Sequence, residues 1–355
     1  MTDSMSWPEI IQSVEEQKHL SKDEARWAMR EIMSGQATDD QMAAFLLGLR
    51  AKGEVLDEIS GFVDVMLDNA VKVPVTNEAI DIVGTGGDQL GTVNISTMAA
   101  IVVASCGYPV LKHGSRSASG KTGSSEMLEA LGIKLDLSPE QLAEVFQKTQ
   151  ITFFFAPLFH PSLKNVAPVR KALGVPTTFN FLGPLANPVQ PIATALGVAN
   201  KGIAPLIANE IKARNRSAIV FRGSDGLDEL TITGPSHVWL VHQNTLTELD
   251  FDPQSLDIPL CSVADLVGGD AQENALVAKV LFAGKLGDRP AIGNIVALNA
   301  AVGMAAMELA HSRDLSEFDF QETISAKFLL AQEAIASGKT QSKMNEWVVA
   351  TNNAK

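Results

Sequence analysis

The chain has 355 residues, 46% of them apolar and 19% charged, so a folded globular protein with a sizeable core is expected. Its 28 Lys and Arg against 41 Asp and Glu give a formal net charge of −13, which argues against nucleic acid and anionic membranes as general partners. At roughly 150 residues per domain, this length predicts about two domains.

The first 75 residues are predicted to form consecutive helices. Three capping boxes, each a Ser or Thr followed three residues later by Glu or Gln, mark helix starts. Gly53 stands where a glycine would end the third helix. We expect a structural helical segment with no chemistry of its own. The three boxes are Ser6 with Glu9, Ser21 with Glu24 and Thr38 with Gln41.

From residue 79 onward, short β-branched runs alternate with helix-length segments. This alternation predicts a mainly parallel sheet with helices on its faces, an α/β architecture. Because ligands of such sheets bind at the carboxyl ends of the strands, the loops that follow the runs are the candidate site. The predicted strands are residues 79–83, 108–112, 151–155, 194–198 and 217–221.

A glycine-rich loop, residues 84–97, joins the first predicted strand to a helix. Glycines let the backbone approach an anion, and the helix start offers free N–H groups, so the loop could hold a phosphate. It fits neither common nucleotide template, because Gln89 replaces the last glycine of GxGxxG and no GK[ST] follows. An ordinary strand-to-helix turn is the alternative interpretation.

A second loop, residues 112–126, follows the next predicted strand and carries three cations and six hydroxyls. It is not a P-loop, because five residues separate Gly114 from Gly120 where the template has four. Charge together with many donors suits a ligand with several phosphates, while a solvated basic loop is the alternative. The cations are Lys112, Arg116 and Lys121.

Asp228 and Glu229 adjoin in a glycine-bounded loop after the last predicted strand. Two carboxylates can bind Mg²⁺ together with a substrate phosphate, although such pairs are more often solvated surface. The presence of two phosphate-type loops favours the metal interpretation. The histidines show neither an HxH nor an HExxH pattern, so a zinc site is not predicted.

Residues 151–174 pass from an apolar strand through a turn to a helix that bears Arg170. A planar aromatic acid could lie on such a wall with its carboxylate near the guanidinium. A buried strand and an unrelated surface arginine are the alternative.

The two cysteines, Cys106 and Cys261, lie far apart and form no CxxC pair, so a reducing cytoplasm is the expected location. The amino terminus lacks a basic region followed by an apolar one, and the apolar run 97–111 is broken by Ser, Gly and Pro. We therefore expect neither a signal peptide nor a membrane span.

Seven motifs, in order and spacing, resemble those of the anthranilate phosphoribosyltransferase family, which is related in fold to the pyrimidine nucleoside phosphorylases. The resemblance covers nearly the whole chain, and LGPLANP with APVRKALG points to this family over the phosphorylases. The motifs are GTGGD, NIST, KHGSRSAS, HPSLKNVAPVRKALG, FNFLGPLANP, DGLDE and GGDAQENA.

The resemblance implies transfer of the 5-phosphoribosyl group from phosphoribosyl pyrophosphate to the amino group of anthranilate, a step of tryptophan biosynthesis, with Mg²⁺ as cofactor. It also implies a cytoplasmic homodimer joined through the amino-terminal helices, with Trp7, Ile11 and Trp27 between the two copies. The expected small helical domain is 1–75 with roughly 165–190, and the large α/β domain is 76–164 and 191–355.

Carried over motif by motif, the resemblance also implies the site residues. Asp228, Glu229 and Ser96 would bind Mg²⁺. Lys112 would assist the departure of pyrophosphate, and His113 and Arg170 would orient the acceptor, with no catalytic base. Contacts to phosphoribosyl pyrophosphate are expected from Gly84, Gly87, Asp88, Thr92, Asn94, Ile95, Ser96, Thr97, Lys112, Ser119, Gly120 and Ser124. Contacts to anthranilate are expected from Gly84, His113, Ser115, Ala156, Pro157, His160 and Arg170, with Gly183 and Pro184 in the matching LGP turn.

Three positions depart from the family pattern. Ser115 replaces the usual Asn, Gly120 stands where a second Ser is common, and Glu126 replaces a common Asp. The loss of the Asn amide removes a donor and an acceptor from the acceptor pocket. A same-fold transferase or phosphorylase with another acceptor is therefore an alternative. A non-catalytic nucleic-acid-binding paralogue is the alternative from another class, which the acidic charge disfavours.

Overall fold

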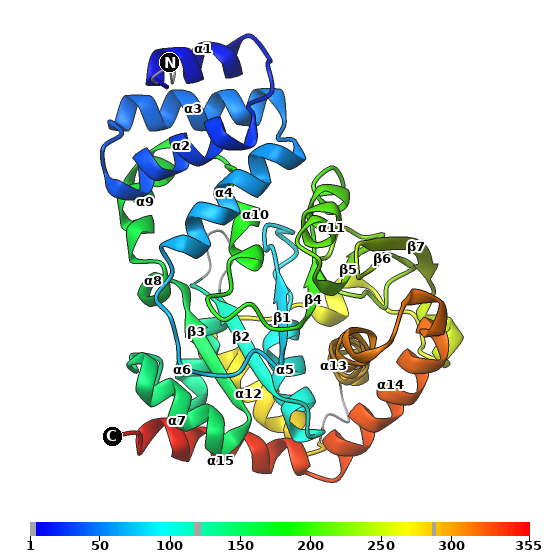
Figure 1. The fold of residues 1–355 in the computed structure, drawn as a ribbon. Helices are drawn as coiled ribbons and strands as arrows, with labels where there is room; N and C mark the ends of the chain where they lie inside the picture. Colours follow the sequence, from blue (N-terminus) through cyan, green and yellow to red (C-terminus); the bar gives the residue numbers. More distant parts are fainter. Residues whose placement is uncertain (1–4, 117–121, 286–288) are drawn as a thin grey trace. The chain divides into compact units, whose positions relative to one another are not determined.

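The structure is a computed structural model that describes residues 5–116, 122–285 and 289–355. The chain divides into two compact units, each built from two stretches of sequence (Figure 1). The helical unit comprises Met1–Val71 and Ala156–Pro188, and the α/β unit comprises Lys72–Phe155 and Val189–Lys355.

The helical unit contains only helices, as the sequence predicts for its first stretch. Its second stretch adds three short α-helices and two 3₁₀ turns. The helices of the first stretch are α1 (Trp7–Glu15), α2 (Lys22–Ser34), α3 (Asp39–Lys52) and α4 (Leu56–Asp68). Those of the second are α8 (Ala156–Phe159), η1 (Pro161–Asn165), α9 (Ala167–Leu173), α10 (Phe179–Leu182) and η2 (Gly183–Leu185).

Two of the three predicted capping boxes form. Ser21 starts α2 and Thr38 starts α3, each accepting a bond from the backbone N–H three residues later. Ser6 precedes α1 but its hydroxyl makes no side-chain cap and donates instead to the Glu9 carboxylate at 2.6 Å. Gly53 ends α3 at φ 81° and donates its N–H to Leu49.

Trp7 belongs to the core of the helical unit. Its ring lies 5.4 Å from that of Trp27 and 5.6 Å from that of Phe45, centroid to centroid. Only 6% of Trp7 is exposed, so its apolar surface is already covered within one copy of the chain. The expectation that Trp7 is left for a contact between copies is therefore wrong, because packing between α1, α2 and α3 buries it first.

Hydrogen bonds between residues far apart in the sequence join the second stretch of the helical unit to the first. The Asn165 amide donates to the Met33 carbonyl at 2.9 Å. Arg50 donates to the Pro176 carbonyl at 2.7 Å, and the Thr178 hydroxyl donates to Glu54 at 2.5 Å. Burial raises the pKa of Glu54. Polar contacts between residues more than a hundred positions apart thus join the two stretches.

The α/β unit is built on a seven-stranded sheet in the order β3-β2-β1-β4-β5-β6-β7. The first five strands in this order are parallel, which confirms the predicted mainly parallel sheet, and the last two add an antiparallel hairpin. The strands are β1 (Ile80–Gly84), β2 (Val110–Gly114), β3 (Ile151–Phe155), β4 (Ala193–Gly197), β5 (Ser217–Gly223), β6 (Ser236–His242) and β7 (Thr245–Phe251).

The hairpin of β6 and β7 is absent from the sequence prediction. Its turn consists of Gln243 and Asn244, both with positive φ (45° and 61°), as two-residue hairpin turns require. Asn favours this conformation, but Gln does not, so the turn signal is weak. The apolar run VWLV within SHVWLVH was the available clue.

Helices flank the sheet, and the longest of them, α13, is central. It packs against α5, α14 and strands β1, β4 and β5 (Figure 1). The helices are α5 (Ile95–Ser105), α6 (Ser124–Leu131), α7 (Pro139–Thr149), α11 (Ala204–Ala213), α12 (Ala271–Phe282), α13 (Pro290–His311), α14 (Phe320–Ala336) and α15 (Lys339–Asn352). The 3₁₀ turns are η3 (Pro253–Leu256), η4 (Val263–Leu266) and η5 (Leu315–Glu317).

Within the described part of the chain, α13 alone is long and apolar enough to match a membrane span by length and composition. Inside the α/β unit, 83% of its most apolar window is buried. The packing around α13 accounts for this apolar surface.

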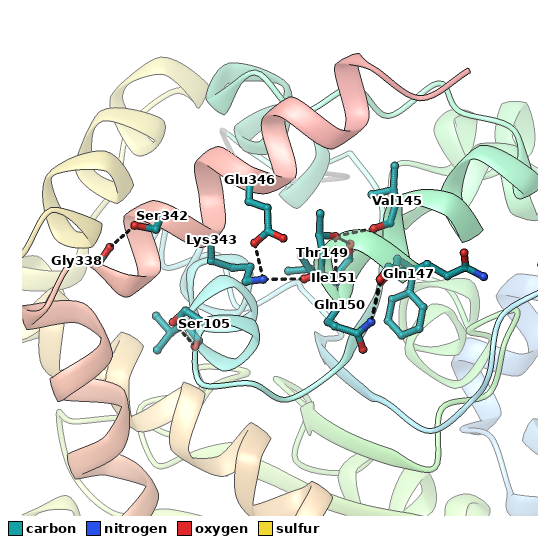
Figure 2. Close-up of polar contacts among 12 residues, drawn as sticks. Ser105, Val145, Gln147, Thr149, Gln150, Ile151, Gly338, Ser342, Lys343 and Glu346 are labelled. Carbon is teal, nitrogen blue, oxygen red and sulfur yellow. Dashed lines mark hydrogen bonds and ion pairs between the residues drawn. The ribbon is translucent and has the colours of Figure 1, made fainter.

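The carboxyl-terminal helix α15 is joined to the end of α7, just before β3, by polar contacts (Figure 2). Lys343 donates to the Thr149 carbonyl at 3.0 Å and pairs with Glu346 at 2.6 Å. The Ser105 and Thr340 hydroxyls meet at 3.0 Å and join α15 to α5. The end of the chain is thus an integral part of the α/β unit.

A buried ion pair closes the turn between α3 and α4. Lys52 contacts Glu58 at 2.8 Å, and their side chains are 1% and 0% exposed. Glu58 also accepts the backbone N–H groups of Leu20 at 2.8 Å and Val55 at 3.0 Å. Three connections of the helical unit therefore depend on one carboxylate.

We predict that Glu58→Gln lowers the free energy of unfolding of the full chain by about 3 to 5 kcal/mol, because it leaves the Lys52 charge buried without its counter-ion. Urea unfolding followed by circular dichroism and tryptophan fluorescence measures the loss. Glu144→Gln breaks an exposed pair with Lys148 and is the control, with a far smaller expected effect. Equal losses in the two variants would contradict the prediction.

Candidate functional site

The glycine-rich loop leaves the carboxyl end of β1 and enters α5. Gly86, Gly87 and Gly91 have φ values of 67°, 85° and 66°, which glycine adopts without strain. Asn94 precedes the first turn of α5, in which the Ile95 N–H donates to the Val93 carbonyl at 2.7 Å and the Ser96 N–H to Glu229 at 3.0 Å. The loop therefore joins a strand to a helix, as the sequence predicts.

The two adjacent carboxylates lie against this loop. Asp228 accepts the Gly86 N–H at 2.7 Å, and Glu229 accepts the Ser96 N–H at 3.0 Å in the first turn of α5. Glu229 is 8% exposed. The surface interpretation of the pair is therefore wrong, because both carboxylates are anchored in the site by backbone donors.

Burial of these carboxylates changes their acidity. Burial raises the pKa of Asp228 to about 6, and the neighbouring Asp88 carboxylate adds to the rise. Burial, followed by the charge of Asp228, raises the pKa of Glu229 well above its ordinary value. The pKa of Asp88 is also raised, first by burial. Burial therefore disfavours the charged form of each carboxylate, and a nearby cation would favour it.

Lys112 on β2 supplies part of that charge from within the protein. It is 2% exposed, and its ammonium group donates to the Ile82 carbonyl and, at 3.4 Å, to the Ser96 hydroxyl. Burial lowers the pKa of Lys112, while Asp81, Glu229 and Asp228 oppose that shift. Lys112 is thus a buried counter-ion of the carboxylates and not part of a solvated basic loop.

Two glycines make room for Asp228. A Cβ on Gly84, the last residue of β1, would lie 2.1 Å from the Asp228 carboxylate oxygen. A Cβ on Gly197, its register partner at the end of β4, would lie 1.7 Å from the Asp228 carbonyl oxygen. Gly197 is absent from the residues predicted from the sequence, which places it inside the predicted strand 194–198 with no sign of its contact with Asp228.

A third segment braces the glycine-rich loop. Thr92 bridges to Val267, and the Asn274 amide donates to the Asn94 side-chain oxygen at 2.9 Å. Asn94 in turn donates to the Thr122 carbonyl at 3.1 Å, and the Thr122 hydroxyl donates to Gly269 at 3.0 Å. The GGDAQENA motif therefore connects the two predicted phosphate loops, a structural function that the sequence did not reveal.

The second loop is described only at its two ends, because Ser119, Gly120 and Lys121 lie outside the described residues. Ser115 is exposed, and its carbonyl accepts the Ser124 hydroxyl at 3.1 Å. Arg116 pairs with Glu129 at 3.2 Å on the surface. The Thr97 and His113 side chains are buried near the start of α5 and on β2.

The remaining predicted residues belong to the helical unit. The His160 ring contacts the Ala186 carbonyl through Nε2 at 2.8 Å and is 1% exposed. Arg170 on α9 donates to Asn180 at 3.4 Å and lies 5.5 Å from the Phe179 ring centroid. Burial lowers the pKa of Arg170. Ala156 and Pro157 start α8, and Gly183 and Pro184 start η2.

The donor set around Asp228 and Glu229 suits Mg²⁺. Within residues 5–116, 122–285 and 289–355, no group of three or more His, Cys, Asp or Glu is arranged to hold a metal ion. Mg²⁺ commonly uses one or two carboxylates and takes its other ligands from water and substrate phosphates. Two oxygen ligands of raised pKa, with the Ser96 hydroxyl nearby, fit that mode of binding.

Comparison with known proteins agrees with these features. Residues 76–341 match the family model described as "Glycosyl transferase family, a/b domain", and residues 8–70 match "Glycosyl transferase family, helical bundle domain". Anthranilate phosphoribosyltransferase of Leifsonia xyli subsp. xyli is 51% identical over 351 residues, which cover 99% of this chain and 100% of that protein.

Solved structures show the same fold. The crystal structure of anthranilate phosphoribosyltransferase from Thermus thermophilus has a TM-score of 0.86 at 33% identity, covering 97% of this chain and 99% of that one. The Saccharomyces cerevisiae enzyme, in complex with phosphoribosyl pyrophosphate and Mg, has a TM-score of 0.86 at 24% identity and 98% coverage of both chains.

Because the relative of 51% identity is matched over its whole length, this chain belongs to the anthranilate phosphoribosyltransferase family.

Proposed function

We propose that this chain transfers the 5-phosphoribosyl group of phosphoribosyl pyrophosphate to the amino group of anthranilate and releases pyrophosphate. The observation that carries the proposal is the pair Asp228 and Glu229, anchored by the glycine-rich loop and the first turn of α5. Helix N–H groups, a glycine turn and buried carboxylates together suit a diphosphate and its counter-ion. In tryptophan biosynthesis this reaction consumes anthranilate.

The chain's own residues bind and orient the donor substrate. Backbone N–H groups of the loop and of α5 contact its phosphates, and the buried Lys112 stabilises the negative charge that grows on departing pyrophosphate. The contacting residues are Gly84, Gly87, Asp88, Thr92, Asn94, Ile95, Ser96, Thr97, Lys112, Ser119, Gly120 and Ser124.

Asp228, Glu229 and the Ser96 hydroxyl would hold Mg²⁺. When bound, the ion neutralises charge on the diphosphate and so makes pyrophosphate a better leaving group. The raised pKa values of both carboxylates support this assignment, because a buried carboxylate pair with one lysine gains from a further cation.

Orientation of the acceptor contributes more to this reaction than a strong catalytic base would. Anthranilate's aryl amine is weakly basic and largely neutral. Placing its lone pair at the anomeric carbon therefore supplies most of the rate enhancement. Arg170 binds the anthranilate carboxylate, and His113 orients the amine. Gly84, Ser115, Ala156, Pro157, His160, Gly183 and Pro184 complete the acceptor contacts.

Our first prediction for the site concerns the metal ligands. Asp228→Ala with Glu229→Ala should abolish the Mg²⁺ response and lower turnover about 100-fold or more, because the diphosphate loses its counter-ion. Loss of anthranilate fluorescence in the presence of phosphoribosyl pyrophosphate measures turnover.

The matched control removes two exposed carboxylates, Glu248 and Asp250, which contact His237 on the β6–β7 hairpin. That double variant should respond to Mg²⁺ as the unmodified chain does. Undiminished turnover of the Asp228→Ala, Glu229→Ala variant in saturating Mg²⁺ would remove these residues from the site.

A second prediction concerns Ser115. Ser115→Asn restores the family's usual amide, and one recovered hydrogen bond is worth roughly 0.5 to 1.5 kcal/mol. The Michaelis constant for anthranilate should therefore fall by a few-fold to about tenfold, while that for phosphoribosyl pyrophosphate stays nearly unchanged. Steady-state kinetics with each substrate varied in turn provides the measurement. A change confined to phosphoribosyl pyrophosphate would place Ser115 outside the acceptor pocket.

We also propose that the chain is a cytoplasmic homodimer whose copies meet through the amino-terminal helices. Ile11 and Trp27 are partly exposed there, unlike Trp7. Sedimentation velocity at micromolar concentration should give the mass of a dimer, and Ile11→Lys should shift it toward monomer, because a charge would be buried between the copies. A monomer in the unmodified protein would refute the proposal.

A further inference from the structure

Asn299 is a fully buried polar residue in the middle of α13, with 0% exposure. Its side-chain oxygen accepts the Leu230 N–H at 2.9 Å, and its amide nitrogen donates to the Leu230 carbonyl at 2.9 Å. The same nitrogen donates to the Ile295 carbonyl at 2.9 Å, one turn earlier in the helix. Both amide hydrogens are therefore used, and the orientation of the side chain is fixed.

Leu230 directly follows Asp228 and Glu229. Residues 227–235 belong to no strand or helix, so no neighbouring ladder pairs with their backbone. The Asn299 amide provides both a donor and an acceptor to one residue of this segment, as a neighbouring strand would. Through this contact, α13 holds the main chain that carries the two carboxylates.

Several constraints act on Asp228 and Glu229 themselves. Gly86 and Ser96 donate to their carboxylates, and Gly84 and Gly197 leave the space that Asp228 occupies. Further along the segment, the Thr231 N–H donates to the Ser236 hydroxyl at 3.1 Å and the Ile232 carbonyl accepts the Cys261 N–H at 3.1 Å. Asn299 binds both main-chain polar groups of Leu230, the residue next to the pair.

We propose that Asn299 is a positioning residue for the cation-binding carboxylates, and that its pairing with Leu230 fixes the orientation in which Asp228 and Glu229 face the ion. The inference rests on the proposed function of that pair. The three hydrogen bonds of the Asn299 side chain go to main-chain groups, so its proposed effect on the ion passes through the backbone. Loss of such an outer contact typically costs 10- to 100-fold in metal affinity.

The test is Asn299→Leu, which keeps the number and branching of the side-chain heavy atoms and removes all three hydrogen bonds. Mn²⁺ serves as the probe: the enzyme-dependent loss of its free electron paramagnetic resonance signal, with phosphoribosyl pyrophosphate present, measures binding without turnover. We expect about 10- to 100-fold weaker Mn²⁺ binding. The Mg²⁺ concentration for half-maximal activity should rise similarly, while the Michaelis constant for anthranilate at saturating Mg²⁺ stays unchanged.

Leu309→Ala is the matched control, because it removes buried volume from the same helix ten residues, or about 15 Å, away. It should lower thermal stability and leave Mn²⁺ binding unchanged. If Leu309→Ala weakens Mn²⁺ binding as much as Asn299→Leu does, the effect is general destabilisation and the proposal fails. Wild-type Mn²⁺ affinity in Asn299→Leu also overturns it.

The Asp228→Ala, Glu229→Ala variant separates this proposal from the one it rests on. If that variant loses Mn²⁺ and Asn299→Leu does not, only the positioning role fails. If that variant binds Mn²⁺ normally, the ligand assignment fails and the positioning role fails with it.

Hydrogen exchange on the unmodified protein provides a measurement that does not depend on any variant folding. The Leu230 amide should exchange as slowly as the amides of α13, because Asn299 holds it in the core. Exchange as fast as that of the Gln243–Asn244 turn would overturn the proposal.

Discussion

The candidate site depends on the close approach of Asp228 to the ends of two neighbouring strands. Gly84 on β1 and Gly197 on β4 are partners in register, and a Cβ on either would overlap Asp228. Any other residue at these positions would push the carboxylate away from the Gly86 N–H. The absence of a side chain at Gly84 and at Gly197 therefore determines where the Asp228 carboxylate lies. The glycine-rich loop and α5 are arranged around this carboxylate.

Burying the Asp228 and Glu229 carboxylates close together costs electrostatic free energy, and the charges of the chain offset only part of that cost. Lys112 is the buried cation near Asp228 and Glu229, and the pKa values of both carboxylates remain raised. A fully neutralised cluster would gain little from another ion, whereas this one retains affinity for positive charge. The incomplete compensation is consistent with the proposed binding of Mg²⁺ together with a diphosphate.

The sequence predicts those parts of the site whose signals are local. The strand-to-helix loop after β1 follows from consecutive residues, and the fold class follows from the alternation of strands and helices. Gly197 and Asn299 carry no such signal, because their importance comes from a loop about thirty and seventy positions away. The β6–β7 hairpin was missed for a local reason, since Gln243 is an unusual residue for a left-handed turn.

The helical unit is discontinuous, and this has a consequence for the order in which the chain matures on the ribosome. Met33, Arg50 and Glu54 emerge early, but their partners Asn165, Pro176 and Thr178 are made more than a hundred residues later. At roughly 5 to 20 residues per second, the amino-terminal helices wait for about six to twenty-five seconds. During that interval β1, β2 and β3 are synthesised, while β4, which pairs with β1, comes only after the helical unit is complete. The nascent chain therefore exposes an open edge of β1, next to unfinished helices, for longer than a protein with contiguous domains would.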